Sequence, residues 1–338
     1  MTVGAVAEPT LRKGSDYARL SKMVNAAGLL ERRPGWYAVK IAVTAAMFIG
    51  GWVAFALVGD SWWQAGVAVF LAVATTQVAF LGHDAGHRQM FRTRRPSDVA
   101  GLVAGNLAVG LSYGWWIDKH TRHHANPNHE DEDPDVGAGA LVWTHEQTLE
   151  RGKFGRWMAR WQAFLFFPLL TLEGLNLHYA SVRALFDTPM RHRRTEAVLL
   201  AVHAVVYLGG VFLVLSPAKA LVFIAIHQGL WGVYMGCSFA PNHKGMPILT
   251  AEDELDYLRK QVLTSRNVRG GPVVDFVLGG LNYQIEHHLF PSMPRSNLRK
   301  AQPIVRDYCA EHGIAYEEAS VVDSYAQALR HLHDAGRP

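Results

Sequence analysis

The apolar positions of the chain gather in four long runs that form two pairs. The runs at residues 37–58 and 62–82 are separated by three residues, and the runs at 197–215 and 220–240 are separated by four. Each run is about 20 residues long and carries at most one charged side chain, as a helix needs in order to cross the hydrocarbon core of a bilayer. The pattern predicts four transmembrane helices in two tight hairpins.

Two further apolar stretches, residues 99–117 and 157–177, are interrupted by Gly, Asn, Pro and Glu. These interruptions favour interfacial or re-entrant helices over complete spans. From residue 251 onward the chain is mostly polar and helical in pattern, with a break at residues 270–272. Tryptophans in the middle of the chain are expected to anchor it at the membrane interface.

Basic residues are concentrated before the first predicted span, after the second and before the third. By the positive-inside rule, this distribution places both termini and the long middle segment in the cytoplasm, although Lys219 in the second hairpin turn argues the other way. The formal net charge of +4 comes without an RNA- or DNA-binding motif, so no nucleic acid partner is expected. We expect a cytoplasmic N-terminal segment at residues 1–36, without a secretory signal pattern, and a single membrane domain at 37–338. The basic residues before the first span are Arg12, Lys13, Arg19, Lys22, Arg32 and Arg33.

Histidine is the unusual residue type, with 17 in the chain, whereas the two cysteines are far apart and show no zinc-site spacing. The sequence contains an HxxxH group at 83–87, an HxxHH group at 120–124 and a QxxHH group at 284–288, and His243 follows the fourth apolar run. Spacings of three and four residues place imidazoles on one face of a helix. All four segments fall on the predicted cytoplasmic side. One metal ion cannot use so many imidazoles, so a dinuclear iron site is a reasonable interpretation, although the ligand type alone does not exclude zinc.

The three boxes, their order, their placement against two hairpins and the Asn-Pro-Asn and Asp-Pro-Asp runs at 126–135 resemble the membrane fatty-acid desaturase family over residues 37–299. The resemblance implies an all-α membrane protein with four transmembrane helices in two hairpins and a cytoplasmic helical cap that holds a di-iron site. It also implies an enzyme that uses two Fe ions and O2 to introduce a cis double bond into the acyl chain of an acyl-CoA or acyl-lipid. By resemblance, the iron ligands are His83, His87, His120, His123, His124, His243, His287 and His288.

Gln284 departs from the histidine pattern, as in the linoleoyl-type subgroup, and ranks below the histidines as a weak or water-mediated ligand or as none. Metal-bound imidazoles usually donate their other N–H to a carboxylate. Trp116 is a candidate to line the acyl site, and cationic side chains are candidates to hold a thioester or lipid headgroup. The candidate carboxylates are Asp84, Asp118, Asp135 and Glu286, and the candidate cations are Lys119, Arg122, Arg94 and Arg95.

No His-Pro-Gly-Gly motif of a fused cytochrome b5 occurs in the chain. The resemblance therefore implies a separate electron donor, either a ferredoxin, a cytochrome b5 or a flavoprotein reductase. One alternative that stays open is a membrane di-iron hydroxylase of a lipid, alkane or carotenoid. Another class is a haem electron carrier or metal transporter, for which His203 and His227 lie inside predicted spans. The histidine groups at the ends of the spans favour the enzyme.

Overall fold

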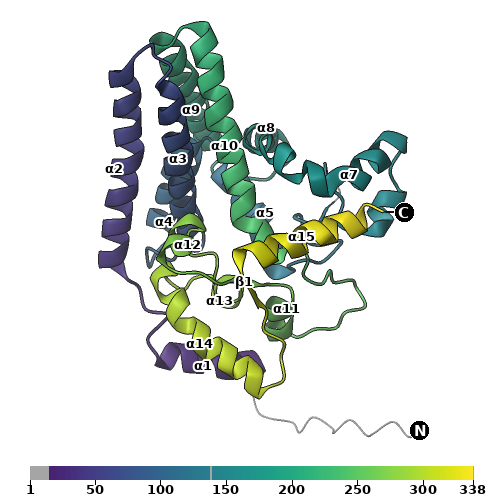
Figure 1. Cartoon of the computed structure of the whole chain (residues 1–338). Helices are drawn as coiled ribbons and strands as arrows, with labels where there is room; N and C mark the ends of the chain where they lie inside the picture. The colour runs from purple at the N-terminus through teal and green to yellow at the C-terminus, as the bar shows by residue number, and fades with distance from the viewer. Residues whose placement is uncertain (1–14, 138, 338) are drawn as a thin grey trace, which may run out of the picture.

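The structure is a computed structural model that describes residues 15–137 and 139–337. Residues 1–14 lie outside the described part, and with them the basic residues Arg12 and Lys13 that contribute to the topology prediction. The described chain is built almost entirely of helices, which confirms the predicted fold class (Figure 1).

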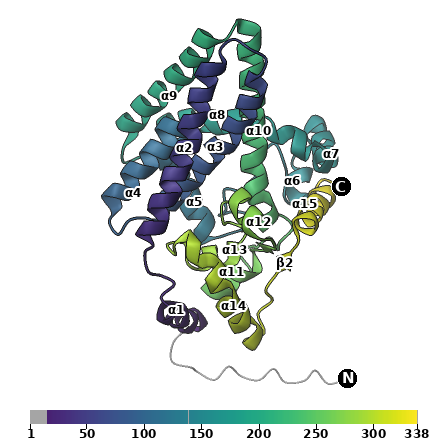
Figure 2. The ribbon, with the colours of Figure 1, turned by 60° about the vertical axis from the view of Figure 1, so that its left-hand side comes forward.

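Four helices are long and apolar enough to cross a membrane: α2 (Pro34–Val58), α3 (Gln64–Gly86), α9 (Arg193–Val214) and α10 (Pro217–His243). They run side by side as two hairpins, α2 with α3 and α9 with α10 (Figure 1, Figure 2). Only 17% of the most apolar window of α2 and of α9 is buried within the protein, against 61% for α3. The first and third spans therefore present their apolar side chains outward, where lipid would cover them, while α3 lies in the centre of the bundle.

The segment between the hairpins begins with α4 (Arg94–Gly101), which continues into a π-helix, η1 (Leu102–Val109), and then into α5 (Tyr113–Ala125). The π-helix ends at Gly110, whose φ of 82° lies in the left-handed region that favours glycine. This irregular stretch falls within the apolar run at 99–117. The long helix α3 packs against α4 and η1.

Three helices complete the middle segment: α6 (His145–Leu149), α7 (Lys153–Leu170) and α8 (Glu173–Asp187). In Figure 1, α7 and α8 extend to one side of the long helices. Large apolar side chains on this arm are exposed, among them Phe154, Trp157, Phe164, Tyr179 and Phe186. An arm with this surface is suited to lie at the membrane interface, as the interrupted apolar pattern predicts.

The remainder of the chain forms a cap at one end of the long helices (Figure 1). It contains α11 (Tyr257–Leu263), α12 (Pro272–Val277), α13 (Gln284–Leu289), α14 (Arg295–Glu311) and α15 (Val321–Ala335). Two short strands, β1 (Asn267–Val268) and β2 (Glu318–Ala319), pair in parallel and tie the segment before α12 to the segment before α15. The sequence pattern does not predict this strand pair.

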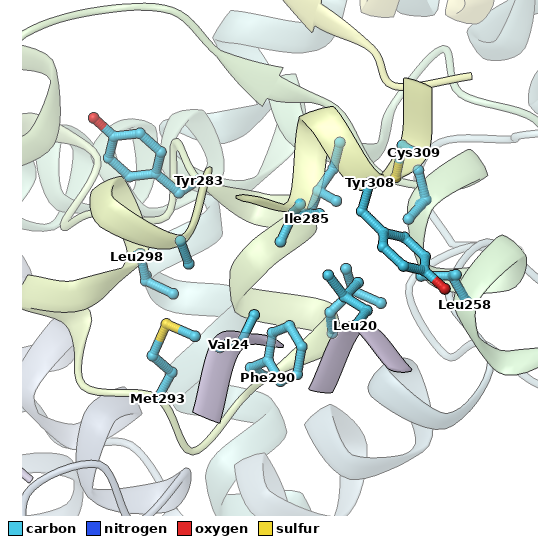
Figure 3. Packing of buried hydrophobic residues seen from close by; sticks show 14 of the residues in the cluster. Leu20, Val24, Leu258, Tyr283, Ile285, Phe290, Met293, Leu298, Tyr308 and Cys309 are labelled. Carbon is cyan, nitrogen blue, oxygen red and sulfur yellow. The ribbon is translucent and has the colours of Figure 1, made fainter. Parts of the chain in front are cut away.

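The N-terminal helix α1 (Asp16–Ala26) packs against α14 and α11. Its buried residues Leu20 and Val24 join an apolar cluster with side chains of the cap, including Ile285, Met293 and Leu298 (Figure 3). Ile285 belongs to α13, which carries the third histidine box. The cluster therefore holds that helix in place from the side of the N-terminus.

Candidate metal centre

Four helices bring the predicted histidines together at the cap end of the long helices. The last turn of α3 and its C-cap carry His83 and His87, and α5 carries the second box. The third box lies on α13. Helix α10 continues through Pro241 and ends at His243, so this histidine is held by a helix and not by a loop.

The imidazoles form two adjoining groups. His83, His87, His120 and His287 each offer one nitrogen, and these nitrogens lie within 4.8 Å of one another. The same holds for the second group, His123, His243 and His288. His124 lies between the groups, because its Nε2 is 3.1 Å from His120 Nε2 and its ring stacks on that of His288 with a centroid distance of 4.2 Å. The arrangement has room for two metal ions side by side.

The surroundings of the buried ring nitrogens fit a metal site. Both nitrogens of His83 and of His287 are buried and have no hydrogen-bond partner among the described residues, which is unusual for buried polar atoms and leaves a nitrogen of each ring available to a metal ion. Burial, followed by the neighbouring imidazoles, holds the pKa values of His287 and His288 well below their usual range. Neutral imidazole is the form that binds metal, so these residues fit a metal pair.

Hydrogen bonds fix the orientation of three rings in the second group. The Nδ1 of His243 donates to the Thr264 carbonyl at 3.0 Å, and the Nδ1 of His288 donates to Gln261 Oε1 at 2.9 Å. These bonds leave both Nε2 atoms, which are 3.0 Å apart, directed into the group. The partners lie on or beside α11, far from the boxes in sequence, and no local motif marks them.

The third oriented ring, His123, lies against two carboxylates. Its Nδ1 donates to Asp133 Oδ2 at 2.8 Å, and the same oxygen accepts the backbone N–H of Asn128 at 2.7 Å. Asp135 is 3.6 Å from His123 Nδ1 and pairs with Lys119. Burial alone would raise the pKa values of both carboxyls, but the His123 hydrogen bond lowers that of Asp133, and Lys119 and His123 lower that of Asp135. Sequence reasoning named Asp135 and missed Asp133, although the Asp-Pro-Asp spacing contains both.

Comparison with known proteins identifies the family of the chain. A sequence profile described as "Fatty acid desaturase" matches residues 60–320. The chain belongs to the fatty acid desaturase family. It is 30% identical over 345 residues to an acyl-lipid (9-3)-desaturase of Physcomitrium patens, an alignment that covers 97% of this chain and 64% of the moss protein.

Two further desaturases show a similar sequence identity to this chain. The chain is 30% identical over 336 residues to fatty acid desaturase 3 of Bos taurus, with 95% of this chain and 73% of the bovine protein covered. It is 29% identical over 331 residues to a Delta(8)-fatty-acid desaturase of Euglena gracilis, with 94% and 78% covered. This chain therefore spans 64% to 78% of the length of these three relatives.

Gln284 is the first residue of the third box. Its Nε2 is 2.9 Å from His243 Nε2, and its Oε1 accepts a hydrogen bond from Asn242 at 3.2 Å. The amide therefore lies at the edge of the second histidine group, in contact with one of its members.

The other predicted carboxylates differ in their contacts with the histidine groups. Asp84 is buried beside His83, with Oδ1 3.5 Å from His83 Nδ1, and it pairs with the buried Arg295 at 2.7 Å. Asp118 is exposed and pairs with Arg122. Glu286 accepts hydrogen bonds from Asn267 and Tyr316, and burial raises its pKa to about 7.

An apolar cavity opens beside the first histidine group. Side chains of α3, η1, α5 and α10 line it, including His83, Leu111, Met235 and Trp116. Trp116 also stacks on His120, with ring centroids 4.5 Å apart. The predicted tryptophan therefore contacts both the cavity and a histidine of the centre.

Three of the four predicted cations are engaged in ion pairs. Lys119 contacts Asp135 at 2.5 Å, and Arg94 contacts Asp98 at 3.4 Å. Arg95 is exposed. Arg122 is bound to Asp118 as described above.

The histidines inside the spans lie apart from the centre. The Nδ1 of His227 is 2.9 Å from the Tyr207 hydroxyl, and its Nε2 is 3.3 Å from Thr75 Oγ1. Both nitrogens of His227 therefore have protein partners outside the two histidine groups.

Proposed function

We propose that this chain is an O2-dependent fatty-acyl desaturase that introduces a cis double bond into the acyl chain of an acyl-CoA or acyl-lipid. The observation that supports this proposal most strongly is the convergence of eight imidazoles into two adjoining groups beside an apolar cavity. An all-imidazole donor set suits iron, and the cavity suits a hydrocarbon chain.

The proposed iron ligands are the seven histidines of the two groups and His124 between them, with Gln284 as a weak or water-mediated ligand at most. Iron bound there supplies the O2-dependent oxidation that converts two adjacent CH2 groups, O2, two electrons and two protons into a cis CH=CH unit and two molecules of water. The protein's own contribution is positioning. Thr264, Gln261 and Asp133 hold three rings with Nε2 directed inward, and the cavity wall formed by His83 and Trp116 brings a hydrocarbon chain against the first group.

We further propose that the termini and the metal centre face the cytoplasm, within a single membrane domain at residues 37–338. The distribution of basic residues supports this orientation. A separate ferredoxin, cytochrome b5 or flavoprotein reductase would supply the electrons. Exposed arginines after α3, such as Arg88, Arg92 and Arg95, would favour an acidic donor, because charges at the rim of an interface steer association.

The proposal is tested by expressing the wild-type chain in a heterologous host and locating double bonds by mass spectrometry of derivatised fatty acids. His123→Ala is the inactive comparison, and His145→Ala, at an exposed position outside both groups, is the control. New unsaturated chains are expected with the wild type and the control only, together with about two irons per purified wild-type chain.

If hydroxylated fatty acids appeared in place of unsaturated ones, the proposed activity would be hydroxylation and not desaturation. A purified wild-type chain that contains no iron would contradict the metal assignment itself. A haem absorption band would favour the electron-carrier class.

A further inference from the structure

The backbone between the π-helix η1 and α5 is irregular, yet its N–H groups all have partners. Leu111 N donates to the Gly105 carbonyl at 2.8 Å, and Ser112 N donates to Ser181 Oγ at 3.0 Å. Tyr113 N donates to the side chain of Asn106 at 3.1 Å. Buried backbone groups need such partners, and here helix α8 and the turn itself provide them.

Two histidines bind the carbonyl oxygens of the same turn. His203 Nδ1 on α9 donates to the Leu107 carbonyl, and His178 Nδ1 on α8 donates to the Gly110 carbonyl, each at 2.9 Å. In a continuing π-helix the Leu107 carbonyl would accept from Ser112 N, but that N–H is directed to Ser181. The histidines therefore satisfy acceptors that the helix end leaves free.

The two imidazoles also enclose the backbone of Gly110. A Cβ at this position would lie 2.5 Å from the ring of His203 and 2.8 Å from the ring of His178. Any movement of the turn toward α8 or α9 would meet one of the rings. The position of Gly110 is thus set by contact as well as by hydrogen bonds.

Glu196 holds the other end of the turn. Its carboxylate is 1% exposed and accepts hydrogen bonds from Ser112 Oγ at 2.6 Å, from Asn106 Nδ2 at 3.1 Å and from Gly114 N at 3.1 Å. Together, His178, Ser181, Glu196 and His203 form a clamp that fixes the backbone from residue 106 to residue 114. None of the four is among the cavity-lining residues or the metal-centre residues described above.

The clamped backbone is one wall of the apolar cavity. Gly105, Val109, Leu111 and Tyr113 line the cavity on this side, and His83 lines it at the metal centre. A displacement of this wall by about 1 Å is enough to change how a bound chain is aligned with a reactive group.

We infer that the clamp determines which pair of acyl carbons is presented to the metal centre, with His178 and His203 as positioning residues for the site of desaturation. The inference rests on the proposed function, since it takes the cavity to hold the acyl chain. It concerns the wall of the cavity and not the chemistry at the centre.

The test compares His178→Leu and His203→Leu, which remove the donors, with His203→Asn, which keeps an N–H at the δ position. His227→Leu is the matched control, because His227 is a buried histidine in the same bundle whose described bonds go to Tyr207 and Thr75 and not to the turn. Hydrogen–deuterium exchange of residues 105–114 in the purified proteins measures the clamp. Double-bond position and acyl-length distribution of the products measure its consequence, and iron content is recorded for each variant.

We expect both leucine variants to exchange roughly fivefold or more faster in this segment, because each loses a hydrogen bond to the turn. They should keep their iron and shift the double-bond position or broaden the acyl lengths, whereas His203→Asn and His227→Leu should match the wild type. Unchanged exchange in the leucine variants would overturn the clamp. Faster exchange with an unchanged product pattern would overturn its role in positioning.

A merely structural role would lower protein yield and iron content with the product pattern unchanged, and would count against the inference. Absence of product from the iron-loaded wild type would overturn the proposed function, and with it the positioning role. The exchange measurement would still decide whether the clamp exists.

Discussion

At the scale of single residues, the histidine centre depends on groups that orient the rings through hydrogen bonds to Nδ1. Asp133 accepts the Nδ1 proton of His123 and is itself held by the Asn128 backbone N–H. The carboxylate is almost fully buried, so it has little freedom to turn toward solvent. This bond directs the other nitrogen of His123 toward His243 and His288.

Replacement of Asp133 by Asn is therefore expected to weaken iron binding by about 10- to 100-fold, because an amide accepts the imidazole proton less strongly and competes for the opposite tautomer. The measurement is iron retained per chain during titration with a chelator. Asp118→Asn, at an exposed position paired with Arg122, is the matched control and should retain iron as the wild type does. Equal retention by Asp133→Asn and the wild type would show that the carboxylate does not support the ligand.

The sequence singles out the histidines that the structure brings together, but it does not single out the side chains that hold their rings. The boxes are local patterns, with spacings that place rings on one helix face. Gln261 and Thr264 contact histidines that are distant in the chain, and only the folded structure brings them together. Asp133 lies in a motif that sequence reasoning used, yet nothing local distinguishes it from Asp135, which instead pairs with Lys119.

At the scale of elements, the N-terminal helix α1 depends on partners from the far end of the chain. Leu20 is fully buried against the cap, while Met23 on the same helix is 45% exposed. A helix of 11 residues is marginal by itself, so packing must supply its stability.

Leu20→Ala should lower the free energy of unfolding of the cap by about 2–5 kcal/mol, through lost burial and the cavity that remains. Thermal or denaturant unfolding in detergent, followed by circular dichroism and by loss of iron, measures the effect. Met23→Ala should change the stability by less than about 0.5 kcal/mol, as expected for a surface position. If both variants unfolded alike, α1 would not be packed against the cap in solution.

The elements that the sequence predicts are those with a strong apolar signal. The four spans agree with the predicted runs to within a few residues at most ends, because their length and lack of charge leave little choice in a bilayer. The helix α1 is hidden in a polar segment, where two buried residues give too weak a pattern. The π-helix and its clamp depend on side chains of α8 and α9. The apolar run at 99–117 therefore predicts that the helix is interrupted, but it does not predict a π-helix.

At the scale of the whole molecule, the metal-free protein is expected to lose stability in acid. The buried His287 and His288 have folded-state pKa values well below the ordinary value of about 6.5, so their contribution is present above about pH 6.5 and is lost as the pH falls and the unfolded chain takes up protons. Each such group lowers the free energy of unfolding by up to about 1.4 kcal/mol per pH unit. Glu286 acts in the opposite direction between its unfolded value and its raised pKa of about 7.

The free energy of unfolding of the iron-free wild type, measured between pH 5 and 6.5, gives the net effect of the histidines and Glu286. We expect the free energy of unfolding to fall more steeply with decreasing pH in Glu286→Gln and less steeply in His287→Gln. Each substitution should change the number of protons taken up on unfolding by up to about one. Slopes that do not differ among the three proteins would show that these side chains are not buried in the iron-free state.

The contact between α1 and the cap also has a consequence for synthesis in the cell. The Tyr17 hydroxyl donates to the Leu289 carbonyl, 272 positions later in the chain, directly after the third box. A ribosome therefore completes α1 and both hairpins before the helix that α1 covers has been translated. A metal ion at the proposed centre can therefore meet its complete set of histidines only after both hairpins have already been made.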